Sequence, residues 1–345
     1  MKKLNDTVVT PPAASVPAEA ALRREVFSVA RLREYGQTYG TFGALILLII
    51  FNLIVTPHFL STQTLSTNLY QVAETIILAM GMTLVIATGG IDLSVGAVMA
   101  IAGSIAALIF VGRIFSFTGP ISYVIAIAVA LLIAAVCGLF NGILVTVFRI
   151  QPIVATLILY IAGRGIAEVL VNGVVDFSNK TFQFIGSGTV LGIPFQVLVM
   201  IIVALFFVWL VRGTIFGRQV VATGGNEPAA RLAGIPVARV KLSVYIIMGI
   251  LAGIAGIFYI SNNSAADPGS IGLGMELDAI AAVAVGGSSL LGGQANIVGT
   301  FVGAIFIQLL TFSLTANNVS ADISKVVEAL LIIVAVYLQT QRKAA

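Results

Sequence analysis

Long apolar runs, separated by short polar segments, limit what this chain can fold into more than any other feature. Hydrophobic residues make up 59% of the 345 residues and charged residues only 9%. A soluble domain carries about 25% charged residues, so this chain has too little polar surface to cover itself in water. The pattern predicts an all-α polytopic membrane protein. It excludes soluble enzymes and nucleic-acid-binding proteins, despite the net charge of +4.

The apolar runs are long enough for a bundle of about ten transmembrane helices. A helix that crosses a bilayer needs about 20 apolar residues. Of the ten expected spans, the fourth is long enough to be tilted or broken, and the eighth is short and bounded by glycine. The spans are expected at 41–57, 70–88, 94–112, 121–147, 152–171, 192–211, 242–261, 277–292, 295–315 and 323–341.

The chain divides into a short polar tail and a transmembrane domain. Residues 1–40 are expected to form a cytoplasmic tail, disordered in its first half. Its second half is expected to form a short interfacial helix that carries Arg23, Arg24, Arg31 and Arg33. Residues 41–345 form the transmembrane domain, and the first apolar run is retained as a span because no small-residue cleavage site follows it.

The distribution of basic residues orients these spans. With the N-terminus in the cytoplasm and ten spans, 14 of the 18 Lys and Arg residues face the cytoplasm, and only Arg113 and Lys180 face the other side. Positive charge collects on the cytoplasmic side of membrane proteins. We therefore expect both termini in the cytoplasm.

The longest cytoplasmic loop, 213–240, contains a segment with the signals of a short helix at 227–233. Asn226 is a favoured N-cap, and Glu227 places negative charge at the positive helix end. Pro228 is tolerated in the first turn, and Gly234 offers a left-handed residue after the last turn. So short a helix is not stable alone. Either it lies on the membrane surface, held by Arg231 and Arg239, or it inserts into a cytoplasmic partner. The segment comprises Asn226, Glu227, Pro228, Ala229, Ala230, Arg231, Leu232 and Gly234.

Two glycine-rich segments predict breaks in the helices. In each, a Gly-Gly pair stands at the cytoplasmic end of a span, and Asp92 or Ser94 is expected to cap the third span, with Asp92 favoured. Comparable broken segments in the two halves of a chain are typical of a pseudo-symmetric transporter and border its pathway. The residues concerned are Gly89, Gly90, Asp92, Ser94 and Gly96 in the first segment, and Gly286, Gly287, Gly292 and Gly293 in the second.

Polar side chains within the spans are candidates for lining a pathway. Two oppositely charged pairs at helical spacing, Arg164–Glu168 and Lys325–Glu328, are expected to neutralise one another. A neutral cargo needs hydrogen-bonding amides and hydroxyls from its pathway. The polar stripe on the second span has an alternative role, because the same side chains could form an internal hydrogen-bond network. The candidate lining residues are Gln71, Glu74, Asn141, Gln151, Asn172 and Gln308.

Several kinds of chemistry lack the residues that they require. A single cysteine, Cys137, and a single histidine, His58, exclude a disulfide framework, a cysteine zinc site and most Ser-His machinery. The chain also lacks a G-x-x-x-x-G-K-[ST] sequence, which binds nucleotide phosphates. We expect neither a catalytic residue nor a metal site nor a cofactor on this chain.

Taken in order, these motifs resemble one family. The stretch Gly81–Gly96, the Gly-Gly-Asn-Glu loop at 224–235 and the run from Glu276 to Gly293 are similar to ribose-type permease subunits of bacterial ABC sugar importers. Phe140–Val145, Gln151–Leu157 and Gly163–Gly165 also resemble that family and its galactofuranose branch. The resemblance covers about 70–340, and the N-terminal tail lies outside it.

The resemblance implies a set of partners. A second permease, identical or homologous, would complete the pathway. Cytoplasmic ATPase subunits would bind ATP and magnesium, and a periplasmic binding protein would deliver a monosaccharide such as a pentose or hexose. It also implies that the 227–234 segment is a coupling helix seated in the ATPase, and that the protein lies in the bacterial inner membrane.

Three alternatives stay open at this stage. An ion-coupled secondary transporter would need a carboxylate without a basic partner, for which Asp92 and Glu74 are the candidates. An intramembrane enzyme is disfavoured because a G-x-S-x-G sequence and paired histidines are lacking. A permease of the same family would differ only in cargo, such as autoinducer-2 or another non-sugar molecule.

Overall fold

The structure is a computed structural model that describes residues 40–115, 120–177 and 180–340. Residues 1–40 and 41–345 form two separate units, and the second unit is described below. The expected cytoplasmic tail and its interfacial helix lie outside the described residues.

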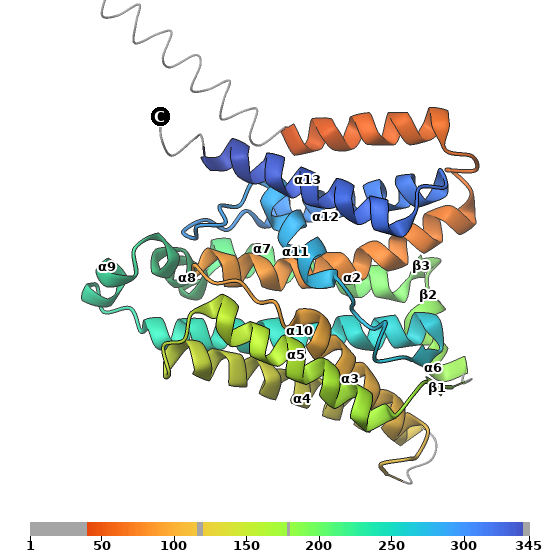
Figure 1. The fold of residues 1–345 in the computed structure, drawn as a ribbon, viewed down its shortest axis with the longest axis horizontal. Coiled ribbons are helices and arrows are strands. Elements are labelled where there is room, and N and C mark those ends of the chain that lie inside the picture. Colours follow the sequence, from red (N-terminus) through yellow and green to blue (C-terminus); the bar gives the residue numbers. More distant parts are fainter. Residues whose placement is uncertain (1–39, 116–119, 178–179, 341–345) are drawn as a thin grey trace, which may run out of the picture. The chain divides into compact units, whose positions relative to one another are not determined.

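Helices account for most of the described chain (Figure 1). An unlabelled helix, Gly40–Val55, comes first. It is followed by α2 Thr62–Ala87, α3 Val95–Phe110, α4 Pro120–Thr146, α5 Pro152–Val171, α6 Lys180–Ser187, α7 Phe195–Gly213, α8 Ile215–Gly225, α9 Glu227–Leu232, α10 Val237–Asn263, α11 Met275–Val285, α12 Ile297–Ala316 and α13 Ala321–Thr340.

Helices α2, α3 and α10 form the centre of the packing. In the most apolar stretch of α2, 83% of the residues are buried, compared with 22% for the peripheral α4. Helix α10 contacts α2, α3 and α4, and α2 also contacts α7, α11 and α12. A hydrogen bond of 3.0 Å from the Thr83 hydroxyl to that of Thr300 joins α2 to α12. The core therefore connects the first and second halves of the sequence.

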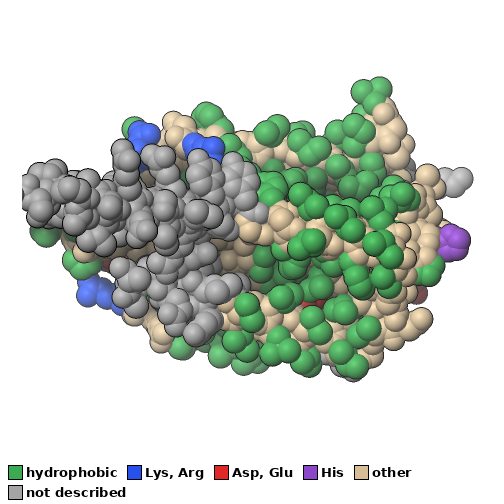
Figure 2. Space-filling view, turned by 90° about the horizontal axis from the view of Figure 1, so that it is seen from above, with side chains coloured by type: hydrophobic (Ala, Val, Ile, Leu, Met, Phe, Trp, Pro, Cys, Tyr) green, Lys and Arg blue, Asp and Glu red, His purple; other side chains and the backbone are tan. Residues whose placement is uncertain are grey.

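The peripheral helices expose their apolar side chains. Ile54, Leu132, Ile161, Val169 and Leu205 are all more than half exposed. Figure 2 shows hydrophobic side chains over most of the uncovered surface, with Lys and Arg gathered towards one end. In water this surface would be unfavourable, because apolar area costs about 25 cal/mol per Å². It suits a bilayer, where lipid tails cover the apolar side chains.

Six described helices are long and apolar enough to cross a membrane: α2, α4, α5, α7, α10 and α12. Gly40–Val55 and α3 are apolar but shorter. An all-α membrane fold is thereby confirmed. Helices overlap all ten expected spans, but whether all ten cross the bilayer stays a prediction.

Some expected boundaries are wrong. Helix α2 begins eight residues before the expected 70, and the eighth span, expected at 277–292, is only the 11-residue α11, which ends before Gly286. Helix α4 runs continuously through 27 residues. The loop expected at 213–240 is largely helical, since α8, α9 and the first turn of α10 occupy it.

The connection between α5 and α7 contains short strands that the sequence did not predict. The two-residue strand β1, Val175–Asp176, pairs antiparallel with β4, Ala265–Ala266. Another short pair joins β2, Thr189–Val190, to β3, Ile193–Pro194. Rings of Phe110, Phe177 and Phe182 pack with centroids 4.7–5.3 Å apart and hold this connection against α3.

Small residues set how closely the helices approach. A side chain at Gly249 of α10 would collide with the backbone oxygen of Ala134 in α4, and one at Gly303 of α12 with that of Ala282 in α11. Such contacts let helices pack without a hydrophobic driving force between them. The spacings Gly249–Gly253 and Gly299–Gly303 are therefore packing contacts.

A larger residue at this contact is expected to destabilise the fold. Gly249→Leu forces α4 and α10 apart, and overpacking of this kind costs about 1–3 kcal/mol. Thermal unfolding of the purified permease should therefore occur at a lower temperature. Gly165→Leu, on the exposed face of α5 with open space around it, is the matched control. Equal unfolding temperatures for the two variants would contradict this account of the α4–α10 contact.

Candidate functional site

Helix α9 forms as its sequence predicts. The side chain of Asn226 accepts a hydrogen bond of 3.0 Å from the backbone N–H of Ala229, and Gly234 follows the helix with φ +81°. Pro228 lies in the first turn, where no helical hydrogen bond is lost. Helix α9 packs on α8 and α10. The expected cap residues and the helix at 227–233 are confirmed, although α9 ends at Leu232.

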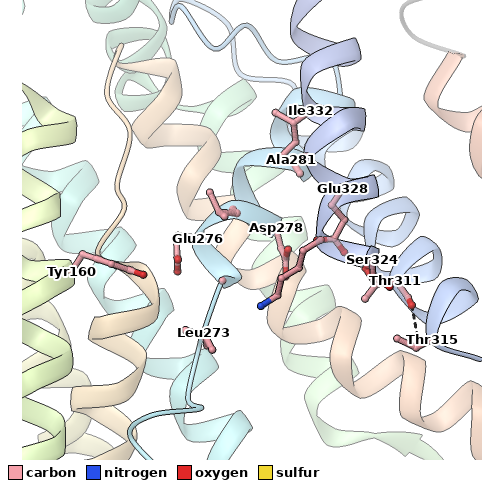
Figure 3. A pocket seen from close by; sticks show the side chains of 14 residues that line it. Tyr160, Leu273, Glu276, Asp278, Ala281, Thr311, Thr315, Ser324, Glu328 and Ile332 are labelled. Carbon is pink, nitrogen blue, oxygen red and sulfur yellow. Dashed lines mark hydrogen bonds between the residues drawn. The ribbon is translucent and has the colours of Figure 1, made fainter. Parts of the chain in front are cut away.

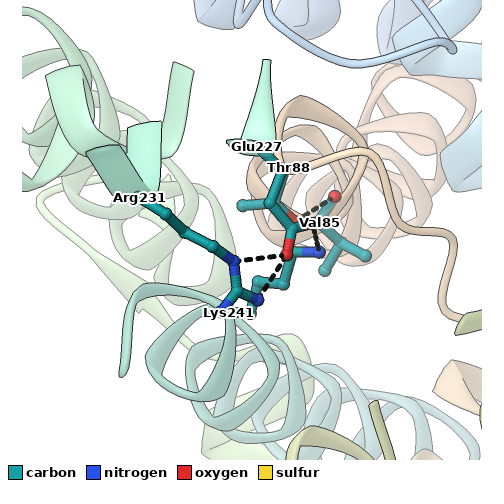
Figure 4. A network of polar contacts seen from close by, with 5 residues as sticks. All are labelled: Val85, Thr88, Glu227, Arg231 and Lys241. Carbon is teal, nitrogen blue, oxygen red and sulfur yellow. Dashed lines mark hydrogen bonds and ion pairs between the residues drawn. The ribbon is translucent and has the colours of Figure 1, made fainter. Parts of the chain in front are cut away.

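Glu227 pairs with one cation inside α9 and with one cation near the start of α10. One carboxylate oxygen of Glu227 lies 2.6 Å from the Arg231 guanidinium, and the other lies 2.6 Å from the Lys241 ammonium (Figure 4). Hydrogen bonds from Lys241 and then Arg231 lower the pKa of Glu227 below its usual value. Arg231 therefore pairs within α9, whereas Lys241 joins α9 to α10.

The outer face of α9 is partly apolar. Leu232 is 92% exposed, and Ala229 beside it is also exposed. Ala230, by contrast, is buried, so the interpretation of Ala229 and Ala230 as one outward surface is wrong for Ala230. The face of α9 that carries Ala229 and Leu232 is therefore the face available to contact another molecule.

The first break, after α2, is held by polar side chains from two other helices. The Asp92 carboxylate accepts hydrogen bonds from the backbone N–H and the hydroxyl of Ser94, at 2.9 and 2.6 Å. Asn141 of α4 donates to the Ser94 hydroxyl, and Thr156 of α5 accepts from the backbone N–H of Leu93. Ser94 precedes α3 without a side-chain cap bond, and the Asp92 carboxylate binds Ser94 itself, so the expected capping of α3 by Asp92 stays a prediction.

The second break, after α11, is held by Asn296. Its amide donates to the carbonyl of Gly286 and its oxygen accepts from the backbone N–H of Gly299, both at 3.0 Å. Gly287, Gly292 and Gly293 all adopt positive φ angles, which glycine tolerates without strain. The loop between α11 and α12 can therefore turn sharply.

The two breaks meet each other and the end of α8. The backbone N–H of Gly293 donates to the carbonyl of Ala87 at 3.0 Å, and a side chain at Gly224 would collide with that same carbonyl. Gly292 in turn approaches Gly89. We call this contact the glycine junction; it comprises residues 87–90, 224–225 and 292–293.

The sequence reading found both breaks but did not place Gly224 and Gly225 with them. The available signal was that three separate segments each carry a Gly-Gly pair. Because α9 follows Gly225 almost at once, the junction connects α9 to the end of α2 and to the loop between α11 and α12 through backbone contacts.

A polar cavity of about 410 Å³ lies beside α9. Its cationic side chains, Arg149, Arg231 and Lys241, outnumber its one carboxylate, Glu227. Gln151, a candidate pathway residue, lines this cavity just before α5.

The other candidate pathway residues do not share one space, and only Gln71 and Gln308 contact each other. Glu74 is buried and accepts a 2.7 Å hydrogen bond from Asn262, in a network with Gln196. Gln71 and Gln308 hydrogen-bond to each other at 2.7 Å. Asn141 is buried at the first break, whereas Asn172 is exposed at the end of α5. Their role in a pathway stays a prediction.

The expected charge pairs are wrong. Arg164 does not pair with Glu168; its guanidinium donates to the backbone oxygens of Pro268 and Ile271, in the loop before α11. Glu328 accepts from the Thr311 hydroxyl instead of pairing with Lys325. In both cases a tertiary partner replaces the partner on the same helix.

Comparison with known proteins identifies the family. The family described as branched-chain amino acid transport system / permease component matches residues 64–336. A galactofuranose transporter permease protein of Escherichia coli (strain K12) is 39% identical, over 87% of this chain and 88% of that protein. A ribose import permease protein of the same strain is also 39% identical, over 87% and 92%. A ribose import permease protein of Bacillus subtilis (strain 168) is 40% identical, over 89% and 94%.

No solved structure matches this chain. The sequence relatives confirm the resemblance to ribose- and galactofuranose-type permeases, whose subunits are not themselves enzymes. The chain therefore belongs to this family of multi-pass membrane permease components.

Proposed function

We propose that this chain is the membrane-spanning subunit of an ATP-driven importer in the bacterial inner membrane, and that its cargo is a monosaccharide. Ribose and galactofuranose are named for the relatives. A periplasmic binding protein delivers the sugar, a second permease completes the pathway, and separate ATPase subunits bind ATP and magnesium. Both termini and α9 face the cytoplasm, an orientation supported by the Lys and Arg residues gathered towards one end of the molecule.

The observation that carries this proposal is the glycine junction beside α9. We infer that α9, including Asn226 to Gly234, is the coupling helix that contacts the ATPase. The Glu227–Lys241 pair fixes it to α10, and the junction fixes the end of α8 to the end of α2 and to the loop between α11 and α12. Movement of the ATPase subunits would then displace α9 and the two breaks together.

The importer test is a reconstitution. The permease is co-expressed with the ATPase and binding protein from adjacent coding regions, purified as a complex and placed in liposomes. We expect uptake of radiolabelled ribose or galactofuranose only when two additions are made. ATP has to be present on the side of the liposome that carries the ATPase subunits, and the binding protein has to be present as well. Uptake that persists without ATP and collapses with an uncoupler would instead establish an ion-coupled secondary transporter.

Leu232 provides the sharpest test of α9. Leu232→Glu places a charge in the proposed apolar contact, and loss of an interface anchor costs about 2 kcal/mol or more, or roughly 30-fold in affinity. We expect the ATPase to stop co-purifying and import to be lost, while the permease stays folded. Leu191→Glu, at a leucine that is 98% exposed between β2 and β3, is the control and should retain both. Normal co-purification of Leu232→Glu would refute the assignment.

The Glu227 contacts predict a pH dependence of α9. The folded-state pKa of Glu227 lies below the usual glutamate pKa of about 4.3. The ionised Glu227 carboxylate therefore stabilises α9 fully at pH values above the usual pKa. The stabilisation is lost as the pH falls through the lowered pKa. Fluorescence anisotropy of a label on Leu232→Cys, in a Cys137→Ala background, should be constant from neutral pH and fall only in that acidic range.

Glu227→Gln should lower the anisotropy at neutral pH and remove the acidic transition. Glu168→Gln, an exposed carboxylate change on α5, should leave the transition in place. A transition that survives Glu227→Gln would show that another group controls α9.

A further inference from the structure

A second cavity, of about 370 Å³, lies between α5, α11, α12 and α13 (Figure 3). None of its residues is among the candidate pathway residues of the sequence reading. It brings three carboxylates, one ammonium group and four hydroxyls around one space. These are Glu276, Asp278 and Glu328; Lys325; and Tyr160, Thr311, Thr315 and Ser324.

The cavity walls come from parts of the chain far apart in sequence. In Figure 3 the Tyr160 hydroxyl, from α5, points towards Glu276 and Asp278 at the start of α11. Glu328 and Ser324 of α13 and Thr311 of α12 lie on the other side of Asp278. The Thr311 hydroxyl donates to Glu328, which fixes that carboxylate in place.

One carboxylate is buried with spare hydrogen-bonding capacity. Glu276 is only 5% exposed, and its Oε2 atom has no hydrogen-bond partner among the described residues. This oxygen lies beside Gly96, where a side chain would crowd it. Glu276 therefore joins the cavity wall to the start of α3, and its carboxylate is held in place by burial.

The loop before α11 is anchored independently of the cavity. Arg164 donates to the backbone oxygens of Pro268 and Ile271 and thereby holds the chain that leads to Glu276. Lys325 is not engaged in an ion pair within the described residues and is free to donate into the cavity. The site is therefore preformed on one side and has an adaptable donor on the other.

This combination of groups matches a neutral polyhydroxyl molecule. Carboxylates accept from sugar hydroxyls, the ammonium donates to their oxygens, and hydroxyls of the protein do both. The Tyr160 ring adds an apolar face against which sugar C–H groups can pack. Arg164 and Lys325 offset part of the negative charge. Within the described residues, no group of three His, Cys, Asp or Glu side chains is arranged to hold a metal ion.

The position of the cavity suits a step in transport. Glu276 and Asp278 are in the first turn of α11, Ser324 and Lys325 lie near the start of α13, and Thr315 lies at the end of α12. In the proposed topology these ends face the periplasmic half of the membrane, away from α9. A volume of about 370 Å³ falls within the 300–1,000 Å³ typical of small-molecule pockets.

We infer that this cavity binds the monosaccharide directly during its passage. Asp278, Glu276 and Glu328 accept from its hydroxyls, Lys325 donates to it, and Tyr160 packs against its apolar face. The inference rests on the proposed function and adds to it a sugar-binding site on the permease itself.

Cysteine protection in the assembled importer tests binding. In a Cys137→Ala background, Thr315→Cys at the cavity wall is modified with a charged methanethiosulfonate reagent, with ribose or galactofuranose present. We expect the transported sugar to slow this modification severalfold, and to leave unchanged the modification of Asn263→Cys, which is exposed outside the cavity. Protection by putrescine but not by sugar would overturn the inference in favour of a cation site.

Asp278→Asn removes a charged acceptor with almost no change of shape. Loss of such a hydrogen bond weakens binding about tenfold or more. We expect sugar protection of Thr315→Cys to disappear and the import rate at saturating loaded binding protein to fall about tenfold. Glu168→Gln, outside the cavity on α5, should leave protection and import unchanged. Equal size-exclusion profiles establish that both variants are folded.

The outcomes separate this inference from the function on which it rests. If wild type imports neither sugar with ATP, the proposed monosaccharide function fails and the cavity assignment falls with it. If wild type imports a sugar but Asp278→Asn imports it equally and retains protection, the function stands and the cavity assignment is wrong. In the third outcome, Asp278→Asn lowers import, but sugar does not protect Thr315→Cys even when Asp278 is retained. The cavity then does not bind cargo.

Discussion

In a bilayer, a backbone amide or carbonyl that leaves a helix has to find its partner inside the protein, because no water is there to replace it. Two breaks between helices of the described residues, after α2 and after α11, are satisfied by side chains and backbone from elsewhere in the chain. Asp92 and Thr156 serve the first break, and Asn296 serves the second. The breaks are thus built structures with defined partners.

The same requirement explains the glycine junction. Three chain segments approach until their backbones touch, and the Gly293 amide finds the Ala87 carbonyl. A side chain at Gly224 would prevent this approach. In the proposed coupling role of α9, this close backbone contact is the route by which a displacement of α9 would reach α2 and the α11–α12 loop. The short length of α9 matters little when its two ends are fixed by α8 and α10.

Much of the α9 region could be read from local signals. Its N-cap, first-turn proline and terminal glycine depend only on neighbouring residues, and the structure follows them. The burial of Ala230 could not be read in this way, because it depends on α8 and α10 packing behind it. The ion pairs predicted from helical spacing are wrong. Arg164 donates to backbone carbonyls and Glu328 accepts from Thr311, because spacing along a helix does not reveal competing tertiary partners.

The sequence by itself determined the all-α membrane architecture, the approximate place of the long spans, the two breaks and the family, because hydropathy, glycine pairs and motif order are local properties. Only the tertiary structure decided which polar groups share a space. The amide-rich candidates Gln71, Asn141 and Gln308 are engaged elsewhere, whereas Tyr160, Asp278 and Glu328, from three different helices, line one cavity. Such convergence depends on how helices rotate and pack against one another, and that is fixed by tertiary contacts that no local pattern reveals.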